Sequence, residues 1–315
     1  MPRRCHWTAV RRDRIARRVV SALGVLIVVH SAAIAVSDAQ ETWFETLPPE
    51  VRRSILWRAD QESGTLNDWI RSSPDQSGSG IFNTGDTDVV VGPTRSVSHS
   101  GAWSVETRIQ NALRAKNGNR AARLMIWTDR PWNQGGKHFP QTAYYSTWMY
   151  FPHVYSPEKQ PPWDPGDGGW WNVFQFKSED ETGRSQPVWS LNVATESAGE
   201  MAFYLYSSVN DPHAVQQKHP VSFRNRQWIH VEAHYRSDVD RRGRITIFQD
   251  GTRILDADAV TTSFGGVTGR DKHAIWGIGN YTDHIAGDPA GEGSATILFD
   301  DSAVSLVPLA PFAKP

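Results

Sequence analysis

The chain of 315 residues is long enough for one large β domain or two small domains, and its 33 basic and 34 acidic residues give a net charge of −1. This balance argues against a general nucleic-acid binder, which needs a basic surface. The single cysteine, Cys5, excludes an intramolecular disulfide.

Residues 1–40 have the pattern of a secretory signal peptide. Seven arginines precede an apolar run over residues 19–36, and small and polar residues follow it. The alternative is an uncleaved membrane anchor, for which the run is marginal because it contains His30 and Ser31. We expect cleavage near Ala39, export or periplasmic location in a bacterium, and no stable membrane insertion. Without this segment, which holds seven Arg and two Asp, 26 basic and 32 acidic residues remain.

A linker is expected over residues 41–54, and one domain is predicted over residues 55–310. Short alternating runs rich in aromatic and β-branched residues predict strands, with Gly, Pro, Asn and Asp clusters between them. Asp250-Gly251 predicts a hairpin turn. About a dozen strands without long helices indicate a sandwich or barrel. The predicted strands are Ile55–Trp57, Asp88–Val91, Trp103–Ile109, Ala121–Trp127, Ala143–Phe151, Trp171–Lys177, Val188–Val193, Met201–Ser207, Trp228–Tyr235, Arg244–Gln249, Ile275–Asn280 and Ala295–Leu306.

Several predicted strands carry a face of aromatic, amide and hydroxyl side chains opposite an apolar face. Strict alternation places Gln175 and Lys177 on one face with Trp171. Rings stack on the apolar faces of sugars, and amides and hydroxyls bond to sugar hydroxyls, so the pattern indicates a polysaccharide groove. The alternative is an interface between packed sheets. The candidate substrate-binding residues are Trp171, Tyr204, Tyr206, Asn192, Trp148 and Tyr150.

The runs AYYSTWMYFP, WWNVFQFKS, PVWSLNV, MAFYLY, QWIHVEAHYR and IWGIGNYTD together resemble jelly-roll polysaccharide lyases of the heparin lyase I and glucuronan or alginate lyase type. The resemblance implies an all-β fold, a two-sheet antiparallel β-jelly roll of the concanavalin A-like kind. Gln175 matches the glutamine of the family's Q-x-H motif, with Lys177 in place of the histidine. Tyr281 matches the tyrosine of a late strand motif, and Arg123 precedes Leu124 where the family has R-x-E-L.

The resemblance implies cleavage of an acidic polysaccharide by β-elimination, in which a base removes the proton next to the uronate carboxylate. Gln175, Lys177 and Arg123 are then expected to hold the carboxylate, and Tyr281 to act as acid and base. His138 is a candidate to replace the missing histidine, although it also fits an ordinary surface histidine. The alternatives are a non-catalytic carbohydrate-binding protein and, less favoured, a glycoside hydrolase, which needs two facing carboxylates.

Two sets of residues suggest metal ions. Glu62, Asp300 and Asp301 have the oxygen ligands of a structural Ca²⁺ site, or they simply end strands. The run HVEAH, residues 230–234, sets two histidines and a glutamate on one strand face, as in Zn²⁺ sites. The outer two residues of that run are about 7 Å apart, so a solvated strand face is favoured.

Overall fold

The computed structural model describes residues 41–69, 80–83, 89–110, 120–128, 139–154, 170–183, 185–195, 200–211, 213–264, 274–282 and 294–313. These ranges contain two short helices, one 3₁₀ turn and fifteen strands in two sheets. Every strand pair is antiparallel, which confirms the predicted all-β two-sheet jelly roll. The predicted signal peptide, residues 1–40, lies outside the described residues. No helix within the described ranges is long and apolar enough to cross a membrane.

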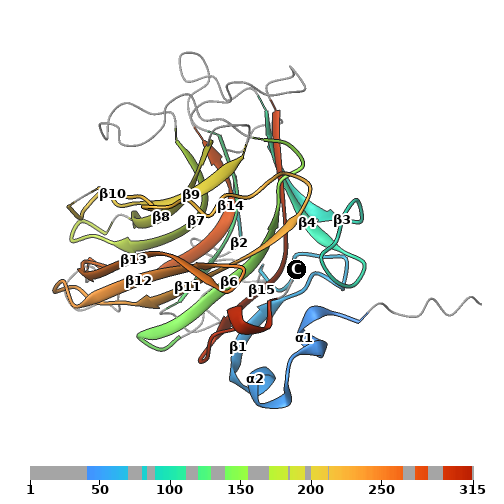
Figure 1. The fold of residues 1–315 in the computed structure, drawn as a ribbon, viewed down its shortest axis with the longest axis horizontal. Coiled ribbons are helices and arrows are strands. Elements are labelled where there is room, and N and C mark those ends of the chain that lie inside the picture. Colours follow the sequence, from blue (N-terminus) through green and yellow to red (C-terminus); the bar gives the residue numbers. More distant parts are fainter. Residues whose placement is uncertain are drawn as a thin grey trace, which may run out of the picture. The chain divides into compact units, whose positions relative to one another are not determined.

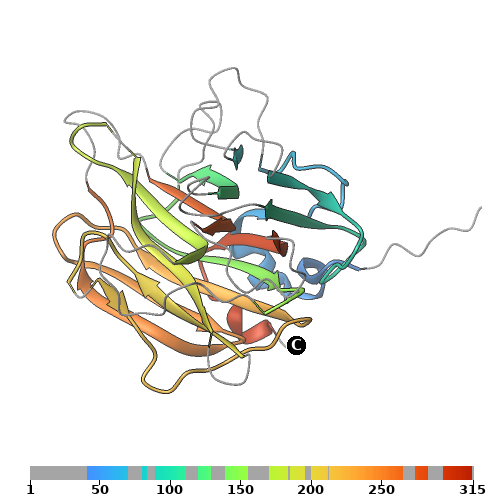
Figure 2. The same cartoon turned by 90° about the horizontal axis from the view of Figure 1, so that it is seen from above.

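The two sheets form the two layers seen in Figure 1. Sheet A has, in spatial order, β13 (Thr252–Val260), β12 (Gly243–Gln249), β11 (Trp228–Arg236), β6 (Thr142–Tyr150), β15 (Ser294–Ser305), β4 (Ser104–Gln110) and β3 (Val89–Thr94), and β1 (Ile55–Ala59) also pairs with β15. Sheet B has β10 (Ala214–Val215), β9 (Met201–Tyr206), β8 (Ser185–Thr195), β7 (Trp171–Glu179), β14 (Ile275–Thr282), β5 (Arg120–Trp127) and β2 (Gly80–Asn83). Figure 2 shows the same strands from above.

Alternating apolar residues of both sheets meet in one core, and aromatic rings connect the layers. Phe176 of β7 stacks on Tyr235 of β11 with ring centroids 3.7 Å apart. The ring centroid of Trp276 on β14 lies 5.5 Å from that of Tyr145 on β6. These four rings come from both sheets, so ring packing fixes how the layers face one another.

The segment expected to be a linker is instead folded onto sheet A. Residues 41–54 contain α1 (Trp43–Thr46) and α2 (Pro49–Ser54), and Pro49 begins α2 where its fixed φ suits a first helical turn. Trp43 is buried against Trp148 of β6, with edge-on ring centroids 5.8 Å apart. The apolar side chains of this segment therefore stabilise the domain. The sequence did not reveal this because two helices of four and six residues are too short to show a helical period.

On the HVEAH face of β11, His230 lies against Trp43 and Glu232 lies under Leu309 and Ala310, so the solvated-face interpretation is wrong for these two residues. His230 and Glu232 are fully buried. Burial, aided by His99, lowers the pKa of His230 to about 3. Burial raises the pKa of Glu232 to about 7, although Leu309 and Ala310 donate backbone N–H groups to its carboxylate. No group of three or more potential metal-ligating side chains occurs in the described part of the chain.

Candidate functional site

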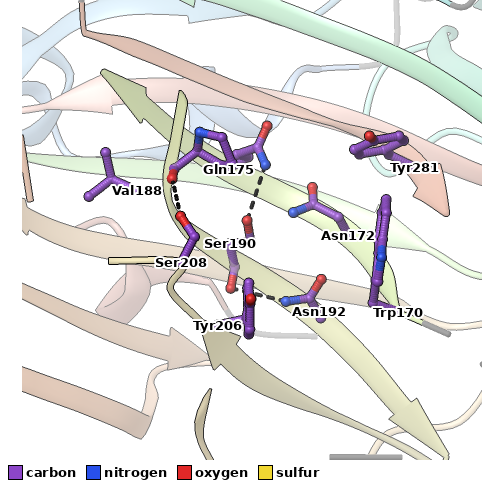
Figure 3. Close-up of a pocket in the computed structure, with 10 residues that line it drawn as sticks. Trp170, Asn172, Gln175, Val188, Ser190, Asn192, Tyr206, Ser208 and Tyr281 are labelled. Atoms are coloured by element: carbon purple, nitrogen blue, oxygen red, sulfur yellow. Dashed lines mark hydrogen bonds between the residues drawn. The ribbon is translucent and has the colours of Figure 1, made fainter. Parts of the chain in front are cut away.

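A pocket of about 180 Å³ opens on sheet B, on the side away from the core (Figure 3). Strands β7, β8, β9 and β14 supply most of its walls. Among the described residues its lining has amides, hydroxyls and three aromatic rings, and neither a carboxylate nor an imidazole. Such a lining suits a sugar. The lining residues are Trp170, Asn172, Gln175, Pro187, Val188, Ser190, Asn192, Tyr206, Ser208 and Tyr281.

A β-bulge in β7 decides which of its residues reach this pocket. Asn172 pairs with Asn192 of β8, but Phe174 pairs with Leu191, so Val173 is an extra residue in β7. Val173 and Phe174 both belong to the core, and the alternation therefore slips by one residue. The bulge places Asn172 and Gln175 together in the pocket, against the strict alternation predicted from the sequence.

The same slip corrects the expectation that Trp171 binds substrate. Trp171 is fully buried in the core, where its indole N–H donates to Oδ1 of Asn280 at 2.9 Å. The neighbouring Trp170 lines the pocket instead, and its ring lies 4.5 Å from the ring of Tyr281. Of the two adjacent tryptophans, one therefore stabilises the core and the other forms the aromatic wall of the site.

Gln175 stands at the centre of a hydrogen-bond network on the pocket floor. Its Oε1 accepts a hydrogen bond of 2.7 Å from Nη1 of Arg123. Its Nε2 donates to Oγ of Ser190 at 3.1 Å, as Figure 3 shows. The guanidinium of Arg123 also lies over the ring of Tyr281, 4.4 Å from its centroid. An amide and a phenol from different strands are thus joined through one cation.

Two cations, Arg123 and Lys177, occupy this part of sheet B, and within the described residues they have no anionic partner. Burial lowers the pKa of Arg123, an effect that Tyr281 partly opposes. Burial, and then the charge of Arg123, lower the pKa of Lys177 to about 8. Neither residue forms an ion pair with any carboxylate in the described ranges. Partly buried charges are costly unless paired, so the site fits an anionic ligand.

The fold agrees with that of known polysaccharide lyases. No protein-family model matches the chain, and no curated protein matches it. The solved structure of an endo-β-1,4-glucuronan lyase from the fungus Trichoderma reesei is similar to it with a TM-score of 0.54 and 14% identity, over 80% of this chain and 96% of that one. This chain has the jelly-roll fold of a polysaccharide lyase.

Two other solved structures share this lyase-like jelly roll at lower TM-scores, too low to support a conclusion by themselves. The cellulose-induced protein Cip1 has a TM-score of 0.46 and 15% identity, over 79% of this chain and 97% of that one. A marine PL7 alginate lyase from Zobellia galactanivorans has a TM-score of 0.41 and 13% identity, over 75% and 92%.

On this lyase fold, two of the predicted substrate-binding residues lie on the wrong sheet. Trp148 and Tyr150 belong to β6 of sheet A, whereas the pocket lies on sheet B. Trp148 is fully buried, with its ring stacked 3.6 Å from that of His99. Tyr150 packs beside Trp228, with ring centroids 5.4 Å apart. Alternation gave the correct face of the strand, but it does not tell which sheet a strand joins.

The other predicted polar-face residues lie on sheet B. Asn192 and Tyr206 line the pocket. Tyr204 pairs with Asn192 across the strands and shares its face, but it is buried. Asn192 donates to the backbone carbonyl of Ser190 at 3.2 Å, so part of its hydrogen-bonding capacity is already used.

His138, the predicted substitute for the motif histidine, lies outside the described residues. None of the described histidines lines the pocket. Three of them contact other residues: His99 contacts Asp301, His213 contacts the Ser207 carbonyl, and His234 lies against Tyr144. The pocket lining thus offers two phenols, Tyr206 and Tyr281, as titratable groups. Lys177 lies two residues beyond Gln175 on β7 and lines a second pocket.

The acidic residues considered for calcium are bonded to the protein itself. Glu62 accepts hydrogen bonds from the backbone of Ala102 and Trp103 at 2.8 and 2.9 Å. Burial, and then Asp301, raise the pKa of Asp300 well above its usual value. Asp301 contacts His99 at 2.7 Å. A calcium ion at these residues stays a prediction.

The sequence placed Ser190 on the polar face of its strand beside Asn192 but did not identify it, Trp170 or Asn172 as site residues. The pair Trp170-Trp171 carried a signal, because two adjacent large rings on an alternating strand must face opposite sides. The side that each ring takes depends on the bulge at Val173, which leaves no mark in the sequence.

Proposed function

We propose that the protein is a polysaccharide lyase that cleaves an acidic, uronic-acid-containing polysaccharide by β-elimination. The observation that supports this most strongly is the pair of partly buried cations, Arg123 and Lys177, beside a pocket that holds Gln175 and Tyr281. A uronate carboxylate is the counter-ion that such a site lacks. The lyase-type jelly roll agrees with this assignment.

The first task of the site is to neutralise the carboxylate. The proton on C5 of a uronate becomes acidic only when the negative charge that spreads onto the carboxylate is stabilised. The Nε2 of Gln175 and the ammonium of Lys177 are donors on one face of β7, two residues apart. They would bind the two carboxylate oxygens, and the stabilisation grows as the dianion forms.

Tyr281 is proposed to carry the proton. Its phenolate oxygen takes the C5 proton, the electrons of the C–H bond form the C4=C5 double bond, and the C4–O bond breaks. The phenol then gives the same proton to the leaving oxygen, so no water is consumed. The Arg123 guanidinium over the ring stabilises the phenolate while it exists.

A non-catalytic carbohydrate-binding protein is the second candidate, because none of the pocket-lining residues in the described ranges is a histidine. A glycoside hydrolase is disfavoured, since the same lining holds no carboxylate pair. The basic and apolar segment 1–40 supports export to the compartment in which such polymers occur.

One assay separates these candidates. The protein is incubated with glucuronan, alginate, pectate or heparin, and the ultraviolet band of an unsaturated uronate is followed. Growth of the band in the native protein, reduced at least about 100-fold in Tyr281→Phe, supports the lyase. Binding without the band supports the carbohydrate-binding protein, and new reducing ends without the band would show hydrolysis and refute both.

A further inference from the structure

Arg123 has to cross a whole strand to reach the residues that it contacts. It lies on β5, Gln175 lies on β7, and β14 runs between them. Adjacent strands are about 4.8 Å apart, so the backbones of β5 and β7 are about 10 Å apart, and the side chains of Arg123 and Gln175 together bridge this separation. In register, Arg123 faces Gly279 of β14, and Gln175 faces Gly277.

Both β14 positions that pair with Arg123 and Gln175 are glycines: Gly279 leaves space for Arg123, and Gly277 leaves space for Met125. A Cβ atom on Gly279 would lie 2.6 Å from Cγ of Arg123, which is closer than real Cβ contacts come. A Cβ atom on Gly277 would lie 2.6 Å from Cγ of Met125, also on β5. Residues 277–279 of β14, with the sequence GIG, thus leave an open path along which Arg123 and Met125 of β5 extend over β14. We call Gly277 and Gly279 the glycine channel.

The guanidinium of Arg123 contacts both Gln175 and Tyr281, but Arg123 does not line the pocket. Its Nη1 donates a hydrogen bond to Oε1 of Gln175, and the Gln175 amide therefore has to present its NH₂ group toward Ser190 and the pocket. An amide can otherwise turn over and present its oxygen, which would repel a carboxylate. The same guanidinium lies over the ring of Tyr281.

We propose that Arg123 is a positioning residue, which passes through the glycine channel, fixes the orientation of the Gln175 amide and supports Tyr281, and does not itself bind the sugar carboxylate. This inference rests on the proposed function for the identity of the ligand. It changes the role expected for Arg123 from direct binding of the carboxylate to control of the residue that binds it.

A double-mutant cycle tests the inference. Arg123→Met keeps the unbranched apolar stem of the side chain and removes the charge and the donors. It is combined with Gln175→Ala and, separately, with Lys177→Met. The dissociation constant for an acidic oligosaccharide and the elimination rate are measured for each variant. Arg244→Met, which removes a partly exposed arginine from sheet A, is the matched control.

A positioning role predicts that Arg123→Met weakens binding about as much as Gln175→Ala does, and that the double variant is no more than about twofold weaker than Gln175→Ala alone. The effects of Arg123→Met and Lys177→Met should multiply. If the effects of Arg123 and Gln175 multiply instead, each contacts the carboxylate independently and the inference is wrong.

A second measurement needs no substrate, so its failure can be told from failure of the proposed function. The side-chain amide signals of Gln175 in a ¹⁵N-labelled protein should show slow hydrogen exchange, and Arg123→Met should accelerate it by at least about tenfold. Unchanged exchange in Arg123→Met would overturn the inference, whatever the protein does to polysaccharides. A native protein that neither binds nor cleaves acidic polymers would overturn only the proposed function.

Discussion

Glu232 is a buried carboxyl whose ionisation should set the pH dependence of stability. Burial raises its pKa from 4.5 to about 7, while the N–H groups of Leu309 and Ala310, at 2.6 and 3.2 Å, lower it. A shift of this size corresponds to about 3 kcal/mol at 1.36 kcal/mol per pH unit. Because the folded pKa is the higher one, this contribution is fully present below pH 4.5 and is lost as the pH rises through 7.

The substitution Glu232→Gln removes the charge and keeps an oxygen that can accept from the same backbone. We therefore expect it to stabilise the protein more above pH 7 than below pH 4.5, by about 3 kcal/mol in the difference. Urea unfolding at both pH values measures this difference. Glu181→Gln, at an exposed position, is the control. An equal effect of Glu232→Gln at the two pH values would refute the reasoning.

Three further predictions concern individual side chains. Affinity for acidic oligosaccharides should fall as the pH rises through about 8, because Lys177 loses its charge there, and Lys177→Arg should remove this fall. Calorimetry measures the affinity, and an equal fall in the native protein and in Lys177→Arg would exclude Lys177 as the cause. Trp171→Ala should lower the unfolding free energy by about 3–5 kcal/mol, whereas Trp170→Ala should mainly weaken sugar binding, by about fivefold. Denaturation and binding curves measure the two effects. A large loss of stability in Trp170→Ala together with a loss of binding in Trp171→Ala would show that the bulge is not at Val173. Trp148→Ala should expose residues 41–54 to limited proteolysis, because Trp43 loses the ring that it packs against, and unchanged cleavage would show that α1 holds without it.

Much of the fold could be predicted from the alternation of apolar and polar residues, which has a period of two along a strand. In β9, Met201, Phe203 and Leu205 face the core, as alternation predicted. The Asp250-Gly251 turn joins β12 to β13, and both residues have positive φ, 47° and 79°, as the tight turns of hairpins require. Local rules succeeded here because neighbouring residues determine both strand faces and two-residue turns.

The candidate site was only partly predictable. Gln175 and Tyr281 are over a hundred residues apart in the chain, and β7 and β14 bring them together as neighbouring strands. The sequence shows neither which strands are neighbours nor where a strand carries an extra residue. For this reason Trp148 was assigned to the wrong sheet and Trp171 to the wrong face.

The extra residue in β7 also affects how related sequences should be compared. A relative with the same number of residues but no bulge in β7 would align with this chain without a gap, yet its residue at the position of Trp171 would point outward. A gapless alignment would then equate a ring that contacts the ligand with one that supports the interior. In comparisons of this strand, residue equivalence therefore has to be established on each side of the bulge separately.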